Sequence, residues 1–177
     1  MENKNLAELF NRTFSGLTFF YRDTELSNHL RGLYQVGQIL LERGITDMTW
    51  KGGGFCTNFR YLIASSFGKD LSMFNPDASK FGLIVLTFNS YFKVLDIYER
   101  NGKTQVFLLN IPEEAIEVFK SAKTNIEEEI IAKARQSFNE KIDSEPLPVL
   151  KNAAWLDRTS FPIGMSDEGE FFYEENK

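Results

Sequence analysis

The sequence is poor in cysteine and histidine. It contains one cysteine, Cys56, and one histidine, His29, among 177 residues. No disulfide can therefore form within the chain, and no group of Cys, His, Asp or Glu has the spacing of a metal site. We expect no metal and no other cofactor. A single unpaired cysteine is typical of a reducing compartment such as the cytoplasm.

Long apolar runs and dense basic stretches are absent as well. No apolar run approaches the length that crosses a bilayer, and the first residues, MENKNLAELFNR, lack the apolar core of a signal peptide. The formal net charge of −5 and the isoelectric point near 5.1 argue against nucleic acid as a partner, because nonspecific binding to nucleic acid requires clustered lysine and arginine. These absences predict a cytoplasmic, acidic protein that binds neither membrane nor nucleic acid.

Aromatic residues, in contrast, are abundant. They make up 14% of the chain, and 17 of them are phenylalanine, whose large apolar rings must be buried in a core or against a partner. Length and composition are otherwise those of one globular domain that can bury its own core. The aromatic surplus therefore belongs either to a core or to an interface.

Hydrophobic spacing in the first half predicts helices. The pattern predicts a short helix at 5–14. It also predicts a long helix, because leucines recur every three or four residues after Thr24. Asp23 or Thr24 can cap the start of this long helix, and Gly44 ends it. A further helix is predicted at 56–67. Its apolar stripe consists of Cys56, Phe59, Ile63 and Phe67.

The middle of the chain predicts three strands, at 81–88, 91–99 and 104–109. Two short turns separate them, Asn89-Ser90 and Asn101-Gly102, and Asn-Gly is a strong signal for a two-residue hairpin. The strands therefore form an antiparallel meander. Two later segments each carry the helix cap Asn/Thr-x-x-Glu, one from Asn110 and one from Thr124, which predicts two helices with a break near Lys123.

After Asp143 the regular pattern ends, because prolines and glycines interrupt it. We predict an α+β domain at 1–144, a three-stranded antiparallel meander packed against helices on one face. The remainder, 145–177, is predicted to be an extended, aromatic-rich segment that docks on this domain or on a partner. Its candidate partner contacts are Trp155, Phe161, Phe171 and Phe172.

The stretch KGGGFCTNFR raises the question of catalysis by Cys56. A cysteine at a helix N-terminus after a glycine loop has its thiol pKa lowered by the unpaired amides and the helix dipole. The order of a cysteine helix and an antiparallel sheet at 50–100 resembles papain-like thiol hydrolases. Those enzymes use a later histidine as base, whereas this chain has only the earlier His29. The catalytic candidates are Cys56, His29 and Asp96, against the simpler reading of a buried sulfur.

The same stretch is also a candidate anion-binding loop. Backbone amides of three glycines can hold an anion, but the loop matches no known phosphate motif, and glycine clusters more often mark a flexible connector. Arg60 lies in the apolar stripe and Asp96 in mid-strand. Because buried charges need partners, the two either meet each other or another polar group, or they line a polar cleft with Tyr98. The candidate ligand contacts are Lys51, Gly52, Gly53, Gly54, Arg60 and Tyr98.

The absence of a complete acid–base set favours a protein without enzymatic activity. We expect a small acidic interaction protein of the inhibitor, immunity or accessory type, with a protein partner, and a homodimer is compatible with the sequence. The alternative is a cysteine-dependent hydrolase or transferase with the glycine loop and Cys56 at its active site. Alkylation of Cys56 under native conditions separates the two, because the first hypothesis predicts an unreactive or dispensable thiol.

Overall fold

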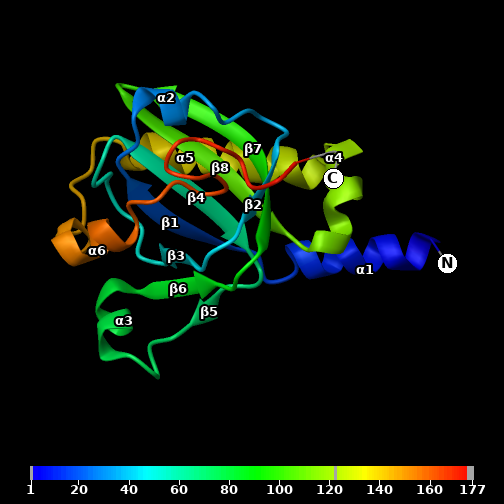
Figure 1. Ribbon diagram of the computed structural model, residues 1–177, viewed down its shortest axis with the longest axis horizontal. Helices are drawn as coiled ribbons and strands as arrows, with labels where there is room; N and C mark the ends of the chain where they lie inside the picture. The colour runs from blue at the N-terminus through cyan, green and yellow to red at the C-terminus, as the bar shows by residue number, and fades with distance from the viewer. Residues whose placement is uncertain (1, 122, 175–177) are drawn as a thin grey trace.

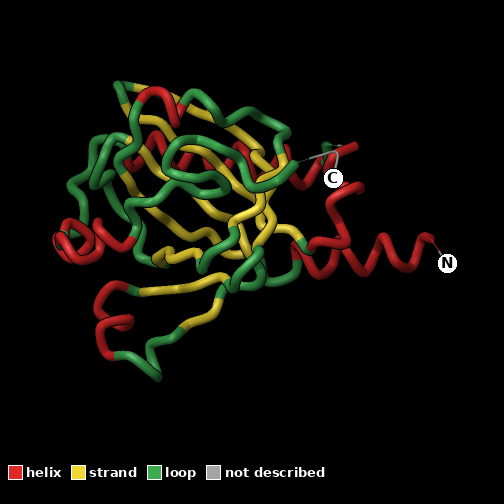
Figure 2. The backbone as a smooth tube through the Cα atoms, viewed as in Figure 1, coloured by secondary structure: helices red, strands yellow, loops and turns green. Residues whose placement is uncertain are grey.

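One mixed sheet of eight strands organises the chain in the computed structural model, which describes residues 2–121 and 123–174 (Figure 1, Figure 2). The strand order is β2-β7-β8-β4-β1-β3-β6-β5, and every neighbouring pair is antiparallel except β4 and β8. The strands are β1 Thr18–Thr24, β2 Ile39–Glu42, β3 Thr46–Thr49, β4 Phe59–Ser65, β5 Lys69–Asp70, β6 Leu83–Leu86, β7 Ser90–Arg100 and β8 Lys103–Ile111.

Helices and loops cover both faces of this sheet. In Figure 1, α5 lies behind the strands, while α2 and the C-terminal segment cross in front of them. The helices are α1 Glu2–Phe14, α2 Asn28–Arg31, α3 Pro76–Phe81, α4 Ile116–Ser121, α5 Asn125–Lys141 and α6 Ala153–Arg158, with 3-10 turns η1 Glu113–Ala115 and η2 Pro148–Lys151.

Strand β4 shows how the two faces are filled. Phe59, Tyr61 and Ile63 point into the cluster beneath α2 and the C-terminal segment, whereas Leu62 and Ala64 point into the cluster beneath α1, α4 and α5. Side chains alternate between the faces of a strand, and every residue of β4 is buried. The strand is therefore buried on both sides, as expected at the centre of a covered sheet.

The predicted three-stranded meander is wrong. β6 pairs with β3 and β5, not with β7, and the predicted helix at 56–67 contains strand β4. A strand buried on both faces has no apolar–polar alternation, so its sequence is hard to tell from a buried helix. The predicted long helix from Asp23 to Gly44 is also wrong: Asp23 and Thr24 end β1, and Gly37 has φ +88, which does not continue a helix.

Two local predictions agree with the structure. Asn101 and Gly102, both at positive φ, turn β7 into β8 with Arg100 opposite Lys103, as a two-residue Asn-Gly hairpin requires. Thr124 and Glu127 form a capping box at the start of α5. Helix α4 ends before it, at Ser121.

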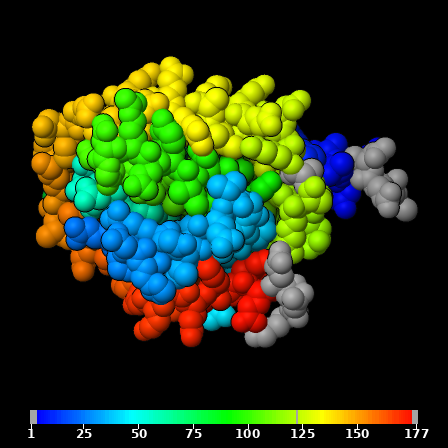
Figure 3. Space-filling view, turned by 90° about the horizontal axis from the view of Figure 1, so that it is seen from above, coloured from blue at the N-terminus to red at the C-terminus, as the bar shows by residue number. Residues whose placement is uncertain are grey.

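The C-terminal segment packs on the rest of the chain. The Trp155 ring stacks on Phe81 with centroids 5.2 Å apart, and Ile163 and Met165 join the cluster on the front face. Figure 3 shows this segment, in orange to red, lying along the blue segment that contains α2. Phe171 meets Tyr34 there, edge to face. Within the described part of the chain, no helix has the length and apolar character needed to cross a membrane.

Candidate functional site

Arg60 and Asp96 do not meet each other; each meets another polar group, which is the second structural alternative that the sequence left open. Arg60 donates from Nε and Nη2 to the two carboxylate oxygens of Asp23, at 2.6 and 3.0 Å, and both side chains are almost fully buried. Asp96 instead accepts two hydrogen bonds of 2.7 Å from Nε and Nη2 of Arg135 on α5. The guanidinium of Arg135 also lies over the ring of Tyr98. Each carboxylate thus has its own arginine, and the two do not share a cleft.

The glycine loop binds a cation of its own chain, through its carbonyl groups. Gly53 and Gly54 accept hydrogen bonds from Arg60 Nη1 and Nη2 at 3.0 and 3.2 Å. Gly52 packs on Tyr21, and a Cβ on Gly54 would overlap the backbone carbonyl of the residue it faces. Lys51 donates to the Lys80 carbonyl at 3.0 Å. The loop is therefore a close-packed structural segment. Its carbonyl groups point toward the guanidinium of Arg60, which is the arrangement of a cation site and not of the predicted anion site.

Cys56 lies beside a carboxylate, which opposes formation of a thiolate. Its backbone amide donates to Asp23 Oδ2 at 2.8 Å, and burial together with the charge of Asp23 raises the pKa of the thiol to about 12. It lies in the coil before β4 rather than at the helix N-terminus that the sequence predicted. His29 lies on α2, and among the described residues no hydrogen bond joins it to Cys56. The geometry offers no activated nucleophile at this position.

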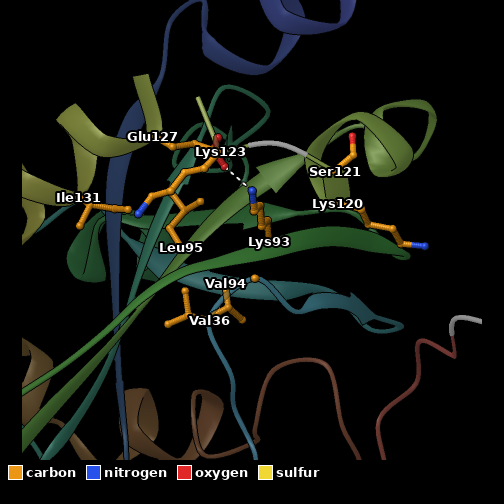
Figure 4. A pocket seen from close by; sticks show the side chains of 10 residues that line it. Val36, Lys93, Val94, Leu95, Lys120, Ser121, Lys123, Glu127 and Ile131 are labelled. Atoms are coloured by element: carbon orange, nitrogen blue, oxygen red, sulfur yellow. Dashed lines mark hydrogen bonds and ion pairs between the residues drawn. The ribbon is translucent and has the colours of Figure 1, made fainter. Parts of the chain in front are cut away.

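A second group of charges lies between β7 and the start of α5 (Figure 4). Lys93 Nζ donates to Glu127 Oε1 at 2.7 Å, and the Glu127 side chain is fully buried. The other Glu127 oxygen accepts from the Thr124 amide in the capping box. The adjoining cavity of about 210 Å³ is lined by aliphatic side chains, among them Val94 and Leu95, and equally by charged ones, among them Lys120 and Lys123. These bonds fix α5 on the sheet, which is a structural role.

The C-terminal segment and strands β1 to β3 enclose a different cavity, which we call the Arg22 cavity. Its volume is about 240 Å³, and it combines charged groups with apolar walls. Its lining residues are Arg22, Glu42, Gly44, Ile45, Arg158, Phe161 and Pro162.

Arg22 is the buried cation of this cavity. Only 5% of it is exposed, and no carboxylate lies within ion-pair distance among the described residues. Nη1 donates to the Asp47 carbonyl at 3.1 Å and Nη2 to the Phe161 carbonyl at 2.7 Å, while Nε has no hydrogen-bond partner in the part of the chain that the structure describes. Desolvation lowers the pKa of Arg22 from its ordinary value. A buried donor without an acceptor is costly, which marks this group for a ligand or a water.

Two further orphaned groups lie on the same face. The buried hydroxyls of Thr24 on β1 and Thr46 on β3 have no hydrogen-bond partner in the described chain. Thr24 follows Arg22 by two residues, so both side chains point to the same face of β1. Next to them, the hydroxyls of Tyr34 and Tyr61 lie 2.5 Å apart, and burial raises the pKa of Tyr61 to about 12. These phenols are neutral donors and acceptors at physiological pH.

The two carboxylates near Arg22 have other partners. Glu42 accepts from the amides of Gly44 and Gly164, at 3.0 and 2.8 Å. Asp47 lies 3.3 Å from Arg158, whose side chain is 41% exposed at the cavity mouth. Burial raises the pKa of Asp47, and the charges of Arg158 and Arg22 oppose that rise. The cavity thus has one interior and one peripheral guanidinium.

The sequence does not predict a site at Arg22. It predicts a helix cap at Asp23 or Thr24 and a partner contact at Phe161. The available signal is an arginine directly after the three aromatic residues of TFFYRDT, because a charged side chain in a buried strand needs a special partner. Of the predicted partner contacts, Trp155 is buried at 2% exposure and Phe161 is 57% exposed. Phe172 lies under the guanidinium of Arg43.

Comparison with solved structures finds enzymes and effectors. The type III effector XopAI from Xanthomonas axonopodis pv. citri has a TM-score of 0.47 and 16% identity over 57% of this chain and 44% of that chain. The ADP-ribosyltransferase HopU1 of Pseudomonas syringae has a TM-score of 0.45 and 20% identity over 54% and 46%. Exoenzyme S from Pseudomonas aeruginosa, bound to Carba-NAD, has a TM-score of 0.45 and 12% identity over 73% and 64%.

These similarities concern part of the chain, which spans less than half the length of XopAI and of HopU1. No protein-family model matches the sequence, and no curated protein matches it. The prediction of a small inhibitor, immunity or accessory protein is contradicted by these comparisons, since the similar structures include named ADP-ribosyltransferases. We therefore do not pursue that prediction, nor the description of the chain as a protein-binding module.

Proposed function

We propose that this chain is a nucleotide-dependent transferase whose donor binds through its phosphates in the Arg22 cavity. The observation that carries the proposal is the unpaired Nε of Arg22 beside an Nη2 that holds only a backbone carbonyl. The fold similarities are too distant to add weight. They only suggest which donor to test first.

The geometry of the guanidinium defines the chemistry of the ligand. Nε and Nη2 form a fork that fits two oxygens of one anion. The chain uses this fork twice elsewhere, where Arg60 binds both oxygens of Asp23 and Arg135 binds both oxygens of Asp96. At Arg22 one branch of the fork meets the Phe161 carbonyl and the other meets nothing. A phosphate or carboxylate supplies the oxygen that Nε lacks and can replace the carbonyl oxygen at Nη2.

A second cation and two apolar walls favour a nucleotide over a simple anion. Arg158 lies at the mouth of the same cavity, so a ligand with two adjacent phosphates can meet both guanidinium groups. Ile45 and Phe161 also line the cavity and are 50% and 57% exposed. A planar base or nicotinamide ring can bury such surfaces. The predicted cytoplasmic location stays a proposal, and so does a protein partner, here as acceptor of the transferred group.

Calorimetric titration tests the proposal, with inorganic pyrophosphate, ADP and NAD as ligands. NAD comes first as donor because exoenzyme S is bound to Carba-NAD. We expect binding, and we expect Arg22→Lys to weaken it by about 10- to 150-fold, because lysine keeps the charge but loses one or more charge-assisted hydrogen bonds of about 1.5–3 kcal/mol. Release of nicotinamide from NAD reports transfer to water without knowledge of the acceptor.

Two further variants keep the test decisive if the buried substitution perturbs folding. Arg158→Gln removes the peripheral guanidinium from a partly exposed position, and we expect weaker binding of ADP and pyrophosphate. Arg100→Gln, in the exposed β7–β8 hairpin, is the matched control and should bind normally. Equal affinities in the wild type, Arg158→Gln and Arg22→Lys, or no binding of any of the three ligands, would contradict the proposal.

A further inference from the structure

The segment that covers Arg22 is short, and among the described residues its first residue, Ser160, is hydrogen-bonded only to Asp157 of α6, through its hydroxyl at 2.8 Å and its amide at 3.3 Å. Residues Ser160, Phe161 and Pro162, which we call the strap, join two buried residues, Thr159 and Ile163, that are both 0% exposed. Ser160 and the Phe161 ring are exposed, and only Pro162 is buried. The Phe161 carbonyl on Arg22 Nη2 is the hydrogen bond that ties the middle of the strap to the cavity.

The two ends of the strap are firmly anchored. Thr159 donates from its hydroxyl to the Asp23 carbonyl at 3.1 Å. On the other side, the Ile163 amide donates to the Tyr61 hydroxyl at 3.1 Å, and its carbonyl accepts from Tyr34 at 2.7 Å. These anchors do not involve Arg22, so a movement of the strap away from Arg22 would leave them intact.

The closed strap competes with a phosphate for the Arg22 fork. The Phe161 carbonyl lies 2.7 Å from Nη2 and takes up hydrogen-bonding capacity of the nitrogen that an anion would share with Nε. The cavity volume of about 240 Å³ is also below the range of about 300–1,000 Å³ that is usual for small-molecule sites. Lifting the strap therefore frees both nitrogens of the fork for a ligand.

We propose that the strap Ser160–Pro162 is a movable lid, whose Phe161 carbonyl acts as a stand-in for a ligand oxygen on Arg22. This inference rests on the function proposed above. When the strap lifts, Nη2 loses a carbonyl and gains a phosphate oxygen, and Nε gains the second one. The Phe161 ring, which has little packing to lose, then closes over the base or nicotinamide. Binding thus exchanges one acceptor for two and buries an exposed aromatic ring.

Stopped-flow binding of a fluorescent ADP analogue tests the lid. If the open strap is a minor state of about 1–10%, the apparent affinity of the wild type is reduced by the same fraction, and its observed rate reaches a plateau at high ligand concentration. Pro162→Gly frees the strap and should raise the plateau and the apparent affinity by about 10-fold or more. Pro148→Gly in η2 makes the same chemical change away from the cavity and should leave both unchanged.

Phe161→Ala tests the second half of the motion. It keeps the carbonyl and removes the ring, so we expect faster dissociation of ADP with little change in the affinity for inorganic pyrophosphate, which has no ring to cover. Circular dichroism and thermal unfolding confirm that each variant is folded.

The outcomes separate the lid from the site itself. If wild type and Pro162→Gly both fail to bind ADP, NAD and pyrophosphate, the proposed function is wrong and the lid falls with it. If ligands bind in an Arg22-dependent manner but Pro162→Gly and Pro148→Gly share the wild-type rates, the site stands and the lid is refuted. Equal effects of Phe161→Ala on ADP and pyrophosphate would refute the closing ring.

Discussion

The ion pair of Arg60 and Asp23 gives the sharpest stability prediction. Its atoms lie 2.6 and 3.0 Å apart, and both side chains are more than nine-tenths buried. Asp23→Asn leaves the guanidinium of Arg60 buried without its counter-charge. Removing one partner of such a pair costs about 3–5 kcal/mol. For a chain of this length, that loss lowers Tm by about 6–20 °C.

A double-mutant cycle in urea measures the pair directly. Asp23→Leu, Arg60→Met and the double variant are compared with wild type, and each midpoint is converted with its own m-value. We expect the double variant to lose less stability than the sum of the singles, by about 2 kcal/mol or more, because each single leaves a buried charge that the double removes. Additive losses, or a loss below about 1 kcal/mol for Asp23→Asn, would refute the reasoning.

Three further predictions concern the glycine loop, the thiol and the second buried ion pair. Gly54→Ala should lower Tm strongly, because the added Cβ would overlap backbone atoms. Gly32 has φ −70, which alanine also adopts, so Gly32→Ala should leave Tm nearly unchanged. Thermal unfolding of the two variants measures the difference. Because the pKa of Cys56 is raised from about 9 to about 12, its thiolate fraction at pH 8 falls about a thousandfold, so iodoacetamide should alkylate it far faster in urea than in the native protein. Equal rates would contradict this. Glu127 forms a buried ion pair with a lysine, so Glu127→Gln should lower the free energy of unfolding in urea by about 3–5 kcal/mol. The exposed neighbour is the control, and Glu128→Gln should lower it by less than about 0.5 kcal/mol. Similar losses in the two variants would show that the buried pair adds nothing to stability.

Local signals predicted local structure correctly. The Asn101-Gly102 hairpin and the Thr124 capping box are set by residues within four positions of each other, so the sequence alone contains the needed information. Strand β4 was misread because both of its faces are covered by segments far away in the chain. Its apolar side chains then recur at helical as well as strand spacing, and only tertiary pairing decides between them.

The candidate site could not be predicted for a related reason. Arg22 is a candidate ligand-binding residue because its Nε has no acceptor among the described residues. Its other two nitrogens are bound by the carbonyls of Phe161 and Asp47, which come from distant parts of the chain, and the sequence does not show that they meet at Arg22. The sequence could flag only that charges such as Arg60 and Asp96 need partners. It could not say that each would find a different one, at Asp23 and Arg135.

The most direct test of the Arg22 site is an NMR titration of arginine Nε–Hε resonances with ADP. Arg22→Lys assigns the Arg22 signal by its loss from the spectrum. We predict that this signal moves strongly and saturably as Nε gains a phosphate oxygen, while the signals of Arg60 and Arg135, whose Nε groups already bind carboxylates, stay in place. An Arg22 signal that does not move at saturating ADP, or that moves no more than those of Arg60 and Arg135, would contradict this prediction.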